Sequence, residues 1–175
     1  GLGIAPDLLV ARSEQPVNDD ALAKLSLFSG VSQKAIASLP NAPSIYEVPL
    51  TLEDTGIADV LADHLHLKTK KPKLKEWRQV VDRATAKHKH HLKVAFVAKY
   101  MDNTDTYMSV FEALKAAGWH NDSDVDIHWV DASDFDSPGV DIARALKGYN
   151  GIVVPGGFGQ RGLEGKIKAA RYALK

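Results

Sequence analysis

Cysteine is absent from all 175 residues of the sequence. Within these residues there is therefore no disulfide framework, no thiolate metal site and no cysteine nucleophile. Any chemistry carried out by this chain must use other side chains or the backbone.

An excess of charge of one sign is also lacking, because 22 Lys and Arg residues balance 22 Asp and Glu residues. A basic field that would attract nucleic acid or an anionic membrane is thus excluded. No apolar run reaches the roughly 18 residues of a membrane-spanning helix, and the first residues lack the layout of a signal peptide. With a hydrophobic content of 45%, the sequence is typical of a globular protein, and we expect a cytoplasmic location.

The first 67 residues alternate strand-like and helical segments. A strand is predicted over 7–13, and a helix over 19–29 with Asn18 as its N-cap and Gly30 as its end. Three apolar residues recur at helical spacing in this helix: Leu22, Leu25 and Phe28. A further helix is predicted across 55–67. Alternation of this kind indicates an α/β domain.

Residues 68–92 have a different character. They open with the basic, proline-interrupted stretch "KTKKPK", which is typical of a linker. One helix follows, with an apolar face made of Leu74, Trp77, Val81 and Ala84. The expected end of this helix, "KHKHH", holds His88, His90 and His91, but a helix end rarely provides the converging side chains that a metal needs.

A regular strand–helix rhythm begins at residue 93. Strands are predicted at 93–100, 124–131 and 151–157, and helices at 104–118, 140–148 and 163–175. The first helix should bury Tyr107, Val110, Phe111 and Leu114 and end at Gly118 as its C′ residue, and the last should bury Leu163, Ile167, Ala170 and Leu174. This pattern predicts half of a doubly wound parallel sheet. Because the last helix has no cap, we expect the sequence to be incomplete.

The glycine-rich stretch "GIVVPGGFGQRGLEGK", at 151–166, directly follows the third of these strands. Its Gly157, Gly159 and Gly162 satisfy the G-x-G-x-x-G spacing of a dinucleotide-binding loop, although that loop normally follows the first strand. A tight turn would also require glycines. A third interpretation is an oxyanion hole, in which backbone N–H groups point at a developing negative charge.

A longer pattern in the same stretch resembles one family. "PGGFGQRGLEGK" is similar to the P-G-G-F-G-x-R-G-x-E-G-K string of the CTP synthases. "GIAPDLLVARS", "AKLSLFSGV", "SIYEVPL" and "KYMDNTDTYMSVFEALKAAG" resemble other segments of the same family, in the same order. We therefore identify the chain as a member of this family.

The resemblance implies a fold and a domain organisation. The fold class is α/β, with parallel sheets and flanking helices: the end of a Rossmann-like synthetase domain, then the first half of a flavodoxin-like class I amidotransferase domain. The implied boundaries are 1–67 for the synthetase part, 68–92 for an interdomain linker and helix, and 93–175 for the amidotransferase part. The family's Mg²⁺-binding acids are expected before Gly1, and its catalytic cysteine after Lys175, so we expect this chain to be inactive alone.

The family's activity is the ATP-dependent amination of UTP to CTP with ammonia from glutamine, with GTP as activator and a homotetramer as the assembly. By resemblance, Lys24 contacts UTP or CTP, and the ATP base lies against Pro40, Asn41 and Ala42. Gly157, together with Gly156, binds glutamine and stabilises the oxyanion. Phe158 and Arg161 belong to a lid where GTP acts. Met108 departs from the family pattern, because some members have lysine there, and this puts a cationic role at that position in doubt.

Overall fold

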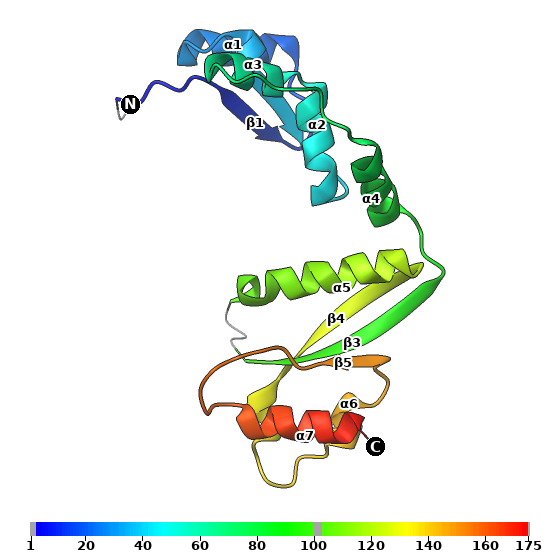
Figure 1. Cartoon of the computed structure of the whole chain (residues 1–175). Coiled ribbons are helices and arrows are strands. Elements are labelled where there is room, and N and C mark those ends of the chain that lie inside the picture. Colours follow the sequence, from blue (N-terminus) through cyan, green and yellow to red (C-terminus); the bar gives the residue numbers. More distant parts are fainter. Residues whose placement is uncertain (1–2, 100–102, 175) are drawn as a thin grey trace. The chain divides into compact units, whose positions relative to one another are not determined.

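A computed structural model describes residues 3–99 and 103–174 of the chain (Figure 1). The chain divides into two compact units, Gly1–Ala86 and Lys87–Lys175. Among the described residues, no helix is both long enough and apolar enough to cross a membrane.

The first unit is built around two parallel strands. Its elements, in chain order, are β1 (Leu9–Ser13), α1 (Asp19–Ser29), η1 (Gln33–Ala35), β2 (Ile36–Pro40), η2 (Ile45–Glu47), α2 (Val48–Asp54), α3 (Ile57–His64) and α4 (Lys75–Thr85). β1 pairs with β2 from Leu9 opposite Ile36 to Ser13 opposite Pro40. The strand–helix–strand crossover from β1 through α1 to β2 confirms the α/β class of this unit.

Helix α1 has the predicted ends but buries less than its pattern suggests. The Asn18 side chain accepts a hydrogen bond from the Ala21 N–H, and Gly30 closes the helix in the left-handed region at φ 74°. Leu22 packs against the core of Val31, Ala35 and Ile36. Phe28, however, is 86% exposed, so the apolar stripe of α1 is wider than the surface that this unit covers.

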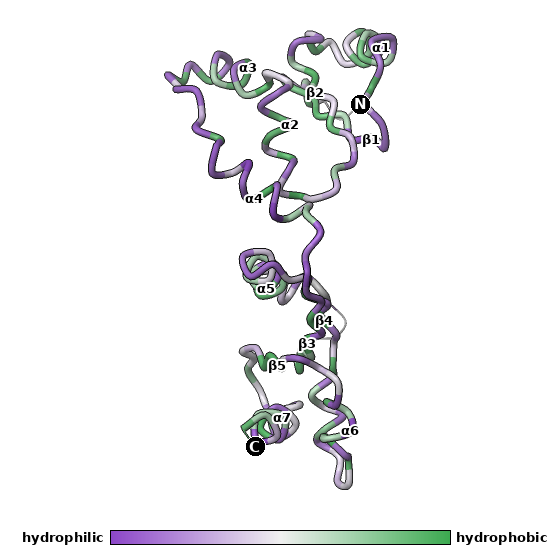
Figure 2. The backbone as a smooth tube through the Cα atoms, turned by 90° about the vertical axis from the view of Figure 1, so that its right-hand side faces the viewer, coloured by the Kyte–Doolittle hydropathy of each residue, from purple (hydrophilic) through white to green (hydrophobic). Residues whose placement is uncertain are grey.

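Helix α4 belongs to the first unit through Trp77. The Trp77 indole N–H donates to the carbonyl oxygen of Tyr46 at 2.8 Å, and the two rings lie 5.9 Å apart. Val81, on the same face, is buried. Between α3 and α4, the stretch 68–73 is hydrophilic (Figure 2).

The second unit holds a three-stranded parallel sheet in the order β4-β3-β5. Its elements are β3 (His90–Ala98), η3 (Thr104–Tyr107), α5 (Met108–His120), β4 (Ser123–Asp131), η4 (Ala132–Phe135), α6 (Ile142–Leu146), β5 (Gly151–Val153) and α7 (Leu163–Ala173). α5 covers one face of the sheet, and α6 and α7 cover the other (Figure 1). Alternate residues of β3 supply the two cores: Phe96 and Ala98 pack towards α5, and Ala95 and Val97 pack towards α7.

Three local predictions in this unit are wrong. Gly118 is not a C′ residue, because α5 continues to His120, and Gly118 instead gives α5 room against β4: an added Cβ would lie 2.7 Å from the Ser123 carbonyl oxygen. The strand β3 begins at His90, so "KHKHH" does not end a helix. α7 buries Gly165, Lys166 and Ala169, whereas Leu163 and Leu174 are exposed.

Candidate functional site

The carboxyl ends of the three parallel strands meet at one edge of the second unit. Ala98 lies opposite Asp131, and Phe96 lies opposite Val153. The residues that follow each strand therefore gather at this edge. In chain order the sheet reads second, first, third strand, as in flavodoxin-like folds, in which ligands bind where the order reverses, between the first and third strands. Here that point lies between β3 and β5, and the glycine loop (residues 155–162) leaves β5 there.

Two buried lysines hold the carbonyl groups of the glycine loop. Lys99, directly after β3, is 3% exposed, and its Nζ donates to the carbonyl oxygens of Phe158 at 3.2 Å and Gly159 at 2.6 Å. Lys166, in the first turn of α7, is 7% exposed, and its Nζ donates to those of Pro155 at 2.8 Å and Gly156 at 3.2 Å. Four loop carbonyls thus face the interior of the unit.

The Tyr107 hydroxyl adds to this inner arrangement by donating to the Gly156 carbonyl oxygen at 3.4 Å. The backbone of the loop lies close to the Lys166 ammonium, since a Cβ added at Gly157 would be 3.1 Å from the Lys166 Nζ. Burial lowers the pKa of the Lys166 ammonium from its usual value, and the neighbouring Lys99 ammonium lowers that pKa further.

The orientation of the carbonyls fixes the orientation of the loop amides. In a trans peptide the C=O of one residue and the N–H of the next point in opposite directions, and the described residues contain no cis peptide bond. The amides that follow the four inward carbonyls therefore point away from the lysines: those of Gly156, Gly157, Gly159 and Gln160. In the described part of the chain, no backbone carbonyl accepts from these four amides. Such a row of N–H groups is suited to a negative charge.

The end of the loop is fastened to the turn after β4. The Asp136 carboxylate accepts hydrogen bonds from the N–H groups of Gly162 at 2.9 Å and Gly165 at 2.7 Å, and so caps α7 from outside the helix. Arg161 lies against the same turn, with its Nε 3.3 Å from the Ser133 hydroxyl and its guanidinium 3.7 Å from the Asp131 carboxylate. The loop is therefore held at both ends.

The predicted residues of the second unit fall within this arrangement. Gly156 and Gly157 present the backbone, Phe158 is 95% exposed, and Arg161 is bonded to the end of β4. Tyr100, predicted at the end of β3, lies outside the described residues. Sequence reasoning missed Lys166, because the apolar pattern of α7 predicted a different buried face from the one that holds Gly165, Lys166 and Ala169.

The predicted nucleotide-binding residues of the first unit lie on two separate elements, α1 and the end of β2. Pro40 ends β2, and the Asn41 N–H donates to the Ser13 carbonyl at the end of β1, at 2.9 Å. Ala42 follows directly, so this segment lies at the carboxyl edge of the small sheet. Lys24 lies on the exposed side of α1, and no hydrogen bond or ion pair among the described residues includes it. Among the described residues, no hydrogen bond joins Lys24 to the segment 40–42.

Two residues of the histidine cluster lie beside carboxylates at the opposite, amino-terminal ends of β3 and β4. His88 lies 3.6 Å from the Asp122 carboxylate and 3.9 Å from that of Asp124, and His91 lies 3.3 Å from Asp124. Within residues 3–99 and 103–174, no group of three or more His, Cys, Asp or Glu side chains could hold a metal ion.

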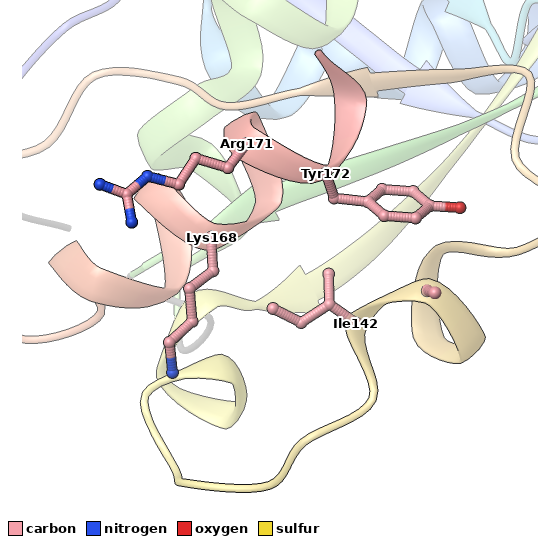
Figure 3. A pocket seen from close by; sticks show the side chains of 5 residues that line it. Ile142, Lys168, Arg171 and Tyr172 are labelled. Carbon is pink, nitrogen blue, oxygen red and sulfur yellow. The ribbon is translucent and has the colours of Figure 1, made fainter. Parts of the chain in front are cut away.

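A pocket between α6 and α7 lies apart from the glycine loop (Figure 3). It is lined by Ile142, Ala143, Lys168, Arg171 and Tyr172. The Lys168 ammonium donates to the Phe135 carbonyl at 2.6 Å. The pocket contains none of the predicted site residues.

Comparison with known proteins agrees with this geometry. Residues 103–175 match the family model described as glutamine amidotransferase class-I, so the second unit is of the class I amidotransferase type. Residues 1–67 match the model described as CTP synthase N-terminus. Together with the relatives below, these matches place the chain in the CTP synthase family. The dinucleotide-binding alternative for the glycine loop is not favoured.

Curated relatives match along almost the whole chain. The CTP synthases of Herpetosiphon aurantiacus and Thermococcus gammatolerans are each 44% identical over 98% of the chain, and that of Thermomicrobium roseum is 45% identical over 98%. The chain spans about a third of the length of these proteins, from 30% to 32%. Among solved structures, the glutaminase domain of Trypanosoma brucei CTPS with bound acivicin is 41% identical, with a TM-score of 0.44 over 47% of this chain and 32% of that chain.

Proposed function

We propose that the chain acts as part of a CTP synthase that aminates UTP to CTP, using ATP and the ammonia released from glutamine. The proposal includes Mg²⁺ as cofactor, GTP as activator, a homotetrameric assembly and a cytoplasmic location. Family membership supports each of these, and the roles of individual residues follow from the resemblance of the motifs around them.

The outward row of amides on the glycine loop is the observation that carries the proposal. When a nucleophile adds to the side-chain carbonyl carbon of glutamine, the carbonyl oxygen becomes an oxyanion. N–H groups held in advance around that oxygen stabilise it more than they stabilise the neutral amide. We assign this role to Gly157 and its neighbour Gly156. Collapse of the intermediate expels ammonia, and water then releases glutamate.

Ammonia released in this way attacks the C4 carbon of UTP that ATP has phosphorylated at its 4-oxygen, and phosphate leaves. The catalytic cysteine of such enzymes is not among these 175 residues. No Mg²⁺ ligands are assigned either, because the described residues offer no metal-holding group. The chain's own contribution is to position substrates.

Nucleotide contacts are assigned to the first unit and to the lid. In this proposal, Lys24 contacts the UTP or CTP nucleotide, where an ammonium suits a phosphate or a pyrimidine carbonyl. Pro40, Asn41 and Ala42 contact the ATP base. Phe158 has an exposed ring that can stack on a base, and Arg161 brings a cation to the lid, where we place GTP.

Substitution Gly157→Ala in the longer protein that carries this sequence tests the proposal. The added Cβ would lie 3.1 Å from the Lys166 Nζ, so the ammonium that holds the loop carbonyls would have to shift. We expect glutamine-dependent CTP formation, followed by absorbance, to fall about 100-fold. Formation of CTP from ammonium chloride should stay within about twofold, because free ammonia bypasses the loop.

The 175-residue chain alone should form no CTP from either nitrogen source. Equal loss of the two activities in Gly157→Ala, or glutamine hydrolysis by the chain alone, would contradict the assignment.

A further inference from the structure

We propose that Lys99 and Lys166 are positioning residues for glutamine hydrolysis, which act through the glycine loop by keeping its carbonyl groups turned inward. This inference rests on the proposed function. Neither ammonium group reaches the outer side of the loop where the amides point, so neither is assigned a contact with glutamine.

The two lysines bond different parts of the glycine loop. Lys166 bonds Pro155 and Gly156, and it therefore sets the direction of the Gly156 and Gly157 amides. Lys99 bonds Phe158 and Gly159, and it sets the amides of Gly159 and Gln160 on the far side of the exposed Phe158 ring. Lys166 thus positions the amides assigned to the oxyanion, and Lys99 positions the amides that follow Phe158 in the lid.

The energetic reason lies in the cost of leaving a part-buried carbonyl without a hydrogen-bond donor. If Lys166 were replaced by an apolar side chain, the Pro155 carbonyl would lose the Lys166 ammonium as its donor, and the Gly156 carbonyl would keep only the longer bond from the Tyr107 hydroxyl. Rotation of the Gly156–Gly157 peptide towards water would remove part of this cost. That rotation would also turn the Gly157 N–H inward, and the oxyanion would lose a donor.

Charge on Lys166 adds a dependence on pH. The titratable groups near its ammonium are the Lys99 ammonium, directly after β3, and the Tyr107 hydroxyl of η3. Because its pKa is lower than that of an ordinary lysine, the Lys166 ammonium loses its proton earlier as the pH rises. The hydrogen bonds from Lys166 to the loop carbonyls should therefore weaken at alkaline pH, whereas the guanidinium of a Lys166→Arg variant would stay charged.

Kinetics of the longer protein test the inference. In Lys166→Met, we expect kcat for glutamine hydrolysis to fall about 100-fold with KM for glutamine within about threefold, and ammonium-dependent CTP formation to be unchanged. Lys166→Arg should recover a large part of kcat, and its alkaline limb should lie at higher pH than that of the unsubstituted protein. Lys168→Met is the matched control, since Lys168 lies on the same helix but bonds the Phe135 carbonyl, and it should change neither parameter.

A second readout separates this inference from the proposed function. In the ¹H–¹⁵N spectrum of the 175-residue chain, Lys166→Met should shift the Gly156 and Gly157 amides far more than Lys168→Met does. If the longer protein fails to hydrolyse glutamine while this shift is present, the proposed function is wrong and the positioning is right. Retention of kcat within twofold in Lys166→Met, identical alkaline limbs for Lys166→Arg and the unsubstituted protein, or unshifted loop amides would each overturn the inference. If Lys166→Met does not fold, Lys166→Arg and Lys99→Arg supply the same comparison.

Discussion

At the scale of single residues, the packing of the second unit depends on a glycine that lets a helix lie directly against a neighbouring backbone. Gly165 lies against the turn after β4, where an added Cβ would overlap the Ala132 carbonyl oxygen and come within 3.0 Å of the Phe135 Cβ. Gly156 is different, because nothing lies within 4 Å of a Cβ added there. The two glycines belong to one motif but are needed for different reasons.

Substitution Gly165→Ala should therefore destabilise the second unit by about 3 kcal/mol or more, since α7 would have to move away from the backbone of η4. Urea unfolding followed by circular dichroism measures the change. Gly156→Ala is the control and should change the free energy of unfolding by less than about 1 kcal/mol. Equal effects of the two substitutions would mean that α7 does not depend on this close approach.

At the scale of elements, α7 is capped from a distant part of the chain. Its own N-cap position is Gly162, which offers no side chain, and the Asp136 carboxylate bonds the Gly162 and Gly165 amides instead. One carboxylate thereby joins the end of the glycine loop, the start of α7 and the turn after β4.

Removal of this cap by Asp136→Ala should lower the free energy of unfolding by about 1–2 kcal/mol, because two N–H groups of the first turn lose their acceptor. Asp136→Asn should lose about half as much, since the amide keeps one acceptor oxygen. Asp134→Ala, a neighbouring exposed carboxylate, serves as the control. The three variants are compared by their urea midpoints, and a loss in Asp134→Ala as large as in Asp136→Ala would contradict the capping role.

Element boundaries were predictable where local rules decide them. The Asn18 and Gly30 caps follow from capping chemistry alone, and the parallel second sheet follows from the strand–helix rhythm. The buried face of α7 and the role of Gly118 were not predictable in this way. Both depend on how closely a helix approaches a segment that is distant in the sequence. A glycine at the contact allows this approach, so the helix can bury the face that carries the glycine even when another face is more apolar. The assignment of Gly156 and Gly157 to an oxyanion came from family resemblance and stays a prediction, whereas the burial of Lys166 required the fold.

At the scale of the whole molecule, each unit has its own core. The core of the second unit includes Phe96, which is fully buried and lies edge-on to the rings of Tyr107, Phe111 and Trp129 at centroid distances of 5.1, 4.8 and 5.4 Å. The core of the first unit is a separate cluster of aliphatic residues.

Substitution Phe96→Ala should therefore destabilise the second unit by about 3–5 kcal/mol and leave the first unit unchanged, because distant sites with no shared partners act additively. Hydrogen exchange of the backbone amides measures both units in one sample. Protection should fall across residues 90–173 and stay the same across residues 9–85. A parallel loss of protection in the first unit would show that the two cores unfold together.

The buried lysines behind the glycine loop have one more consequence. Each peptide between an inner ammonium and an outer N–H is a dipole aligned by the charge beneath it, so the positive potential of the interior reaches the surface through groups that are themselves neutral. Such polarised amides favour any negative charge at this edge, whether it belongs to a bound anion or develops on an oxygen during a reaction. The strength of this preference should therefore depend on the charge of two lysines that lie on the inner side of the loop.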